Sequence, residues 1–103
     1  MNTPSVAHPR TLFRSRVDHA SATLLRSVMA DGWRPETAAR ELLATIRFDR
    51  RVLLLMRARL AKAALQRPTR ITDRAAVTLE LAMTTAERRH ATTYIPRQGG
   101  AHA

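Results

Sequence analysis

The stretch "FDRRVLLLMRARLAKAALQR", residues 48–67, decides how this chain folds. It holds six basic residues and the longest run of large aliphatic side chains in the sequence. At about 100° per residue it forms a helix with two apolar faces. The broad face contains Val52, Leu53, Met56, Leu60, Ala63 and Ala64, and the narrow face contains Leu54, Ala58, Ala61 and Leu65. Because a helix that is apolar on two sides is usually covered from both, we expect it to be the central helix of a bundle.

The basic residues of this helix lie at the boundaries between its two apolar faces. Arg51, Arg59 and Lys62 share one boundary, and Arg50 and Arg57 share the other. These edges can be exposed to solvent and can contact phosphate groups.

The apolar spacing of residues 38, 42 and 46 continues into residues 53, 56 and 60, so a single helix over residues 35–66 would fit the pattern. Asp49 would then lie on the buried face, where an unpaired carboxylate is costly. We therefore predict a break near Phe48, with Asp49 as the N-cap of a new helix.

Two helices are predicted before the break and two after it, the central helix and a last one. The first runs from Thr11 or Leu12 to Asp31, with Gly32 ending it, and the second begins at Pro35, a residue favoured at the first helical position. Trp33, between them, is expected to pack back onto the core. The last helix runs from about Thr72 to His90, after Pro68 ends the central one. The expected core stripes are Phe13, Val17, Ala20, Leu24 and Val28 in the first helix, Ala38, Ala39, Leu42, Leu43 and Ile46 in the second, and Ile71, Ala75, Leu79, Ala82, Met83 and Ala86 in the last.

The predicted architecture is all-α: a small bundle of three to four helices in one domain, residues 11–91. Residues 1–10 are expected to be a disordered N-terminal tail, and residues 92–103 a flexible C-terminal tail.

Several functional classes are disfavoured by composition. Without cysteine there is no disulfide, thiolate zinc site or cysteine nucleophile, which fits a cytoplasmic protein. No stretch approaches the roughly 20 apolar residues of a membrane span. The four histidines lack metal-ligand spacing, and no glycine-rich phosphate loop or nucleophile motif occurs. We therefore expect no enzymatic activity, no cofactor and no metal.

Charge gives the strongest functional signal. The chain has 18 basic and 8 acidic residues, a formal net charge of +10. Residues 34–74 contain eleven of the basic and four of the acidic residues, so the middle of the chain carries most of the surplus. A surplus of this size indicates an anionic partner, first nucleic acid and then an acidic protein surface.

Nucleic acid, DNA more than RNA, is the preferred partner. "PETAARELLA", a short link and a basic helix have the outline of a helix-turn-helix, although the usual glycine of the turn is missing. The second helix is too apolar over residues 52–56 to read bases, so phosphate contacts are expected to dominate. The predicted contributors are Arg50, Arg51, Arg57, Arg59, Lys62, Arg67 and Arg70.

Binding to RNA instead of DNA is a variant of this hypothesis. The succession "VDHASATLL", "AARELL" and "RRVLLLM", over about residues 17–57, loosely resembles the rhythm of ANTAR domains, three-helix RNA-binding antitermination modules. The sequence departs from that pattern at Ala22, where the family has glycine, in a longer link after the first helix, and in the additional C-terminal helix. The resemblance implies an RNA partner and is not an assignment to the family.

The alternative hypothesis is a non-enzymatic regulator or inhibitor that binds an acidic protein surface. Val77 and Leu81 lie outside the core stripe of the last helix. They either contact other helices or form an interface, including that of a homodimer. The second apolar face of the central helix is the other expected anchor.

Overall fold

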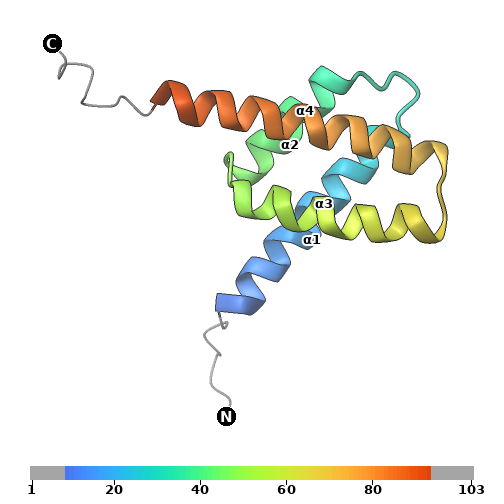
Figure 1. Ribbon diagram of the computed structural model, residues 1–103, viewed down its shortest axis with the longest axis horizontal. Helices are drawn as coiled ribbons and strands as arrows, with labels where there is room; N and C mark the ends of the chain where they lie inside the picture. The colour runs from blue at the N-terminus through green and yellow to red at the C-terminus, as the bar shows by residue number, and fades with distance from the viewer. Residues whose placement is uncertain (1–8, 94–103) are drawn as a thin grey trace, which may run out of the picture.

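The computed structural model describes residues 9–93, and these form four helices: α1 (Pro9–Met29), α2 (Pro35–Ile46), α3 (Arg50–Gln66) and α4 (Arg70–Thr93) (Figure 1). No strand occurs among these residues, so the predicted all-α bundle is confirmed. The predicted tails fall largely outside the described residues. Where they overlap, at residues 9–10 and 92–93, the chain is helical, and α1 therefore begins earlier than Thr11.

The break between α2 and α3 is present, and Asp49 is the N-cap of α3, as predicted. Its carboxylate accepts a hydrogen bond from the backbone N–H of Arg51 at 3.0 Å. The missing turn glycine is replaced by two residues with positive φ, Arg47 at 54° and Phe48 at 60°. The N–H of Phe48 donates to the carbonyl of Leu43 at 3.0 Å, the six-to-one bond of a Schellman motif. Left-handed conformations cost non-glycine residues roughly 1–2 kcal/mol each, so this turn depends on the contacts around it.

The core is built around α1 and α4, each of which contacts all three other helices. The predicted stripes of α1, α2 and α4 supply it, apart from Phe13, Ile71 and Met83, which are half-buried against its edge. Trp33 packs on this core, as predicted, and its indole Nε1 donates to the hydroxyl of Thr78 at 3.1 Å. Thr78 is completely buried and donates in turn to the carbonyl of Arg74, so the polar pair is satisfied inside the bundle.

The prediction that residues 50–66 form the central helix is wrong. α3 packs mainly on α1 and α4 at one side of the bundle, antiparallel to α4 (Figure 1). Its buried residues are Val52, Leu53 and Met56, all in its first half. The narrow apolar face is exposed: Leu54 is 47% exposed and Leu65 is 87% exposed. The physical reason lies in side-chain size, since Ala58 and Ala61 at the middle of that face offer little area to bury.

The peripheral position of α3 predicts opposite results at two adjacent leucines. Leu53→Ala removes a side chain that is 1% exposed and should lower the free energy of unfolding by about 2–5 kcal/mol. Leu54→Ala, its neighbour on the outer side, should lower it by about 1 kcal/mol or less. Urea unfolding followed by circular dichroism measures both, and equal losses would show that α3 is covered on both sides.

Candidate nucleic-acid interface

The seven predicted cations do not form one cluster, because they are distributed along the whole of α3 and the turn after it. Arg50 and Arg51 are at its first turn, whereas Lys62, Arg67 and Arg70 lie at or beyond its last turns. A helix of 17 residues is about 25 Å long, so these two groups are well separated.

Three of the seven are already paired within the chain: Arg51 with Asp49 of its own helix cap, and Arg57 and Arg59 with carboxylates of neighbouring helices. Arg59 Nη1 lies 3.0 Å from the carboxylate of Asp18 on α1, and Arg57 Nη1 lies 4.0 Å from that of Glu80 on α4. Exposed pairs of this kind contribute about 0–1 kcal/mol, but they cancel local charge. Lys62, Arg67 and Arg70 are exposed and form no ion pair with any of residues 9–93.

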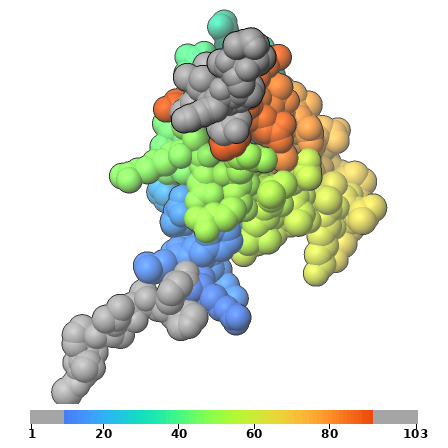
Figure 2. Space-filling view, turned by 60° about the vertical axis from the view of Figure 1, so that its left-hand side comes forward, coloured from blue at the N-terminus to red at the C-terminus, as the bar shows by residue number. Residues whose placement is uncertain are grey.

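A group of arginines lies where α2 meets α3. We call it the basic corner, and it consists of Arg16 and Arg51, which contact Asp49, Arg47 and Arg50, which lie beside it in the chain, and Arg89, which contacts the neighbouring Phe48 ring. All five arginines are exposed. In Figure 2 the corner lies near the middle of the view, with α1 below it and the C-terminal part of α4 above.

Asp49 organises the basic corner. Arg16 Nη1 and Arg51 Nη2 each lie 3.0 Å from its Oδ2, and Arg51 Nε donates to its Oδ1 at 3.2 Å. The hydrogen bond from the Arg51 side chain is the main cause that lowers the pKa of Asp49 to about 2, with Arg16 adding to it and partial burial opposing it. Asp49 is therefore ionised at neutral pH and offsets one of the five positive charges.

Aromatic rings hold two of the arginines in place. The guanidinium of Arg89 lies 4.0 Å from the centre of the Phe48 ring, and that of Arg51 lies 5.6 Å from the centre of the Phe13 ring. Cation–π contacts of this kind contribute about 0.5–1 kcal/mol at exposed sites. Glu87 lines a small hollow with Arg50 and is a second carboxylate at this corner. The five arginines of the corner thus outnumber the carboxylates of Asp49 and Glu87.

Three members of the basic corner were absent from the sequence prediction: Arg16, Arg47 and Arg89. Arg47 adjoins the predicted break, and its place in the run "IRFDRR" was a usable signal. Arg16 and Arg89 come from α1 and α4, and only the packing of those helices brings them to Asp49 and Phe48.

No group of three or more metal-ligating side chains occurs among residues 9–93, and none of the helices described there has the length and apolar content to cross a bilayer. Asp73, Glu80 and Glu87 recur at seven-residue spacing along α4 and form an exposed acidic line. Val77 is 49% exposed, while Leu81 is half-buried against the core, so a role for this pair as an interface stays a prediction.

Comparison with protein-family models, with curated proteins and with solved structures found no match to this chain. The resemblance to ANTAR domains therefore gains no support, and function has to be argued from the surface itself.

The Asp49 geometry predicts a pH-dependent contribution to stability. Asp49→Asn keeps an N-cap residue, since Asn caps as well as Asp, but loses both ion pairs. At pH 7 we expect a loss of about 1 kcal/mol in the free energy of unfolding. A carboxyl whose pKa falls from 3.8 to about 2 on folding stabilises the protein above pH 3.8, and this contribution disappears as pH falls through 2.

The difference between wild type and Asp49→Asn should therefore be constant from pH 7 to pH 5 and shrink between pH 4 and pH 2. Urea unfolding at each pH measures it. Asp31→Asn is the matched control, because Asp31 is exposed and forms no ion pair within residues 9–93. A difference that does not change with pH would contradict the role assigned to the Asp49 carboxylate.

Proposed function

We propose that this protein binds nucleic acid through phosphate contacts made by the basic corner. The observation that carries the proposal is the presence of five exposed arginines, from three helices and the α2–α3 turn, at the turn capped by Asp49, where two of them contact its carboxylate and a third contacts the Phe48 ring. Guanidinium groups bind phosphate oxygens in a bidentate manner, and arginine is less strongly hydrated than lysine. A cluster of this kind is suited to a polyanion.

The same geometry supports sequence-independent binding. The outward face of α3 carries Leu54, Ala58, Ala61 and Leu65 between its cations, and none of these can donate to or accept from a base edge. Contacts to the phosphate backbone position a protein on nucleic acid without reading its sequence. Duplex DNA is the first target, because the order α2, turn, α3 keeps the outline of a helix-turn-helix, and RNA is the second.

A second group of cations extends the proposed surface. Lys62 follows Arg51 by eleven residues, which is three helical turns, so the two lie on the same side of α3 about 16 Å apart. Arg67 and Arg70 lie beyond Lys62 in the following turn and at the start of α4. A duplex lying along α3 would contact both groups, whereas Arg57 and Arg59 are held by their carboxylate partners.

Charge reversal at the corner tests the proposal. Arg47→Glu with Arg50→Glu should weaken binding to a random duplex by at least about tenfold at 100 mM salt. Arg26→Glu with Arg34→Glu is the matched control, because these arginines are also exposed and lie in the last turn of α1 and at the N-cap of α2, away from the corner. Both double variants change the net charge by the same amount, so only the corner pair should produce the large loss.

A salt series gives a second readout of the same contacts. With about five phosphate contacts, the log–log slope of affinity against salt should lie near −4 to −5 for the wild type on duplex DNA. The corner variant should lose about two units of that slope and the control much less. Fluorescence anisotropy with labelled duplex, single-stranded DNA and RNA measures it. Equal losses in the two variants, or no wild-type binding at about 50 mM salt, would contradict the proposal.

A further inference from the structure

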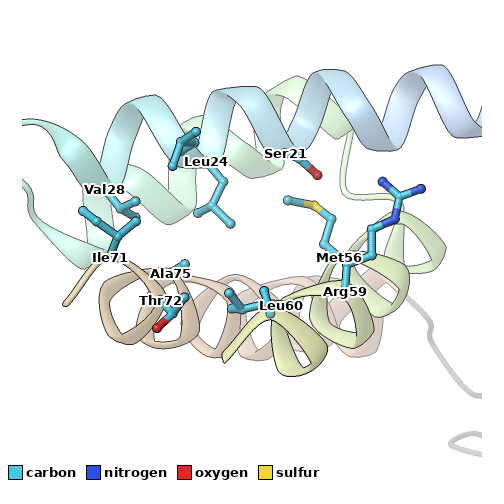
Figure 3. A pocket seen from close by; sticks show the side chains of 11 residues that line it. Ser21, Leu24, Val28, Met56, Arg59, Leu60, Ile71, Thr72 and Ala75 are labelled. Carbon is cyan, nitrogen blue, oxygen red and sulfur yellow. The ribbon is translucent and has the colours of Figure 1, made fainter. Parts of the chain in front are cut away.

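An apolar groove lies on another part of the molecule, between α1 on one side and α3 and α4 on the other. Its volume is about 370 Å³. Figure 3 shows Leu24 and Val28 of α1 facing Met56 and Leu60 of α3 and Ile71 and Ala75 of α4 across it. The groove exists because the second half of α3 has no buried residue, so it does not close against α1.

The side chains that line the groove are suited to an apolar ligand. Leu24, Val28, Met56 and Ala75 are buried at the groove and form its floor, while Leu60 and Ile71 are half-buried. Its two hydroxyl side chains are already satisfied. Ser21 donates to the carbonyl of Val17 at 2.8 Å, and Thr72 donates to the carbonyl of Thr69 at 2.8 Å. Neither needs a hydrogen bond from a ligand.

Two arginines border the groove. Arg59 stands at one end of it (Figure 3), and its guanidinium pairs with Asp18. Arg67 lines an adjoining hollow that shares Ala63 and Thr72 with the groove. Helix α3 itself contains no acidic residue over its 17 positions. A ligand for this groove therefore combines apolar groups with negative charges at their margins.

We propose that the groove docks an acidic amphipathic helix from a partner protein. Helices bind apolar grooves by inserting side chains spaced at i, i+4 and i+7, with the remaining faces directed to the rim. Aliphatic anchors would fill the space between Leu25, Leu60 and Ile71. Flanking carboxylates would meet Arg67 beside the groove and share Arg59 at its end with Asp18. The proposal gives a specific site to the protein-binding alternative and does not rest on nucleic-acid binding.

A second copy of this chain fits the groove poorly. The exposed apolar face of α3 is bordered by Arg50, Arg57 and Lys62, so docking it would bring like charges together. The acidic line of α4 has the negative charge that the arginines beside the groove would attract. Along that line, however, Val77 is the one large apolar side chain that is exposed. One valine does not fill a volume of about 370 Å³.

A synthetic peptide tests the proposal directly. The probe is a fluorescein-labelled amphipathic helix with leucines at i, i+4, i+7 and i+11 and glutamates on its other faces. A matched peptide carries lysine in place of glutamate. Fluorescence anisotropy should give micromolar binding for the glutamate peptide and at least about tenfold weaker binding for the lysine peptide.

Paired variants locate the binding site. Leu25 lines the groove and is 50% exposed, and Leu12, on the same helix outside the groove, is 54% exposed. Leu25→Asp should weaken peptide binding at least about tenfold, the loss of one apolar anchor, whereas Leu12→Asp should change it less than about twofold. Circular dichroism establishes that both variants fold, and duplex binding should be unchanged in both.

Three outcomes would overturn the proposal. The first is no binding of the glutamate peptide up to about 1 mM, and the second is an equal loss in the Leu25 and Leu12 variants. The third is wild-type self-association in sedimentation that Leu25→Asp abolishes, which would make a second copy the occupant. Because the duplex titrations use different residues, failure here is distinguishable from failure of the nucleic-acid proposal.

Discussion

The carboxylate of Asp49 is the constraint on which the shape of this molecule depends. It caps α3, so the chain turns after Ile46 and does not continue as one rod of 32 residues. It also holds Arg16, which donates a hydrogen bond to the carbonyl of Ile46 at 3.4 Å, so α1 is tied to the end of α2. The same group that sets the turn thereby collects the arginines of the basic corner. A structural role and an electrostatic role coincide in one side chain.

Helix α4 packs at the centre of the bundle, and α3 lies at its edge. The apolar stripe of α4 has neighbours on three helices, whereas α3 uses only the first half of its broad face. Its second half therefore keeps Leu60 half-exposed and Leu65 almost fully exposed. Exposing that much apolar side chain lowers stability, and in monomeric proteins exposed apolar surface bordered by polar groups is characteristic of interaction sites. The groove and the exposed cationic edges of α3 thus both result from the peripheral position of this helix.

Sequence reasoning succeeded where the pattern is local. The core stripes follow from the spacing of apolar residues within each helix. The break follows from the cost of burying one residue, Asp49. It failed where the outcome depends on competition between helices. The narrow face of α3 is apolar by residue type, but its alanines have little apolar area to bury. The larger side chains of α4 therefore occupy the core instead. The pairs Asp18–Arg59 and Arg16–Asp49 join residues 41 and 33 positions apart in the chain. Only the packed fold shows that Asp18 offsets the charge of Arg59, which was predicted as a contact residue. It also shows that Arg16, which was not predicted, lies at the corner.

The two proposed surfaces overlap at the far end of α3 but not at the basic corner. Arg47, Arg50 and Arg89 are at the α2–α3 end, whereas Arg59 and Arg67 border the groove, and the length of α3 separates the two ends. At physiological salt the screening length is about 8 Å, which is shorter than that separation. An acidic helix in the groove would therefore neutralise Arg67 with little effect on the corner. Under the two proposals, nucleic acid and an acidic helix would compete only for cations at the far end of α3, and a nucleic acid that contacts the corner alone would leave the groove open to the helix.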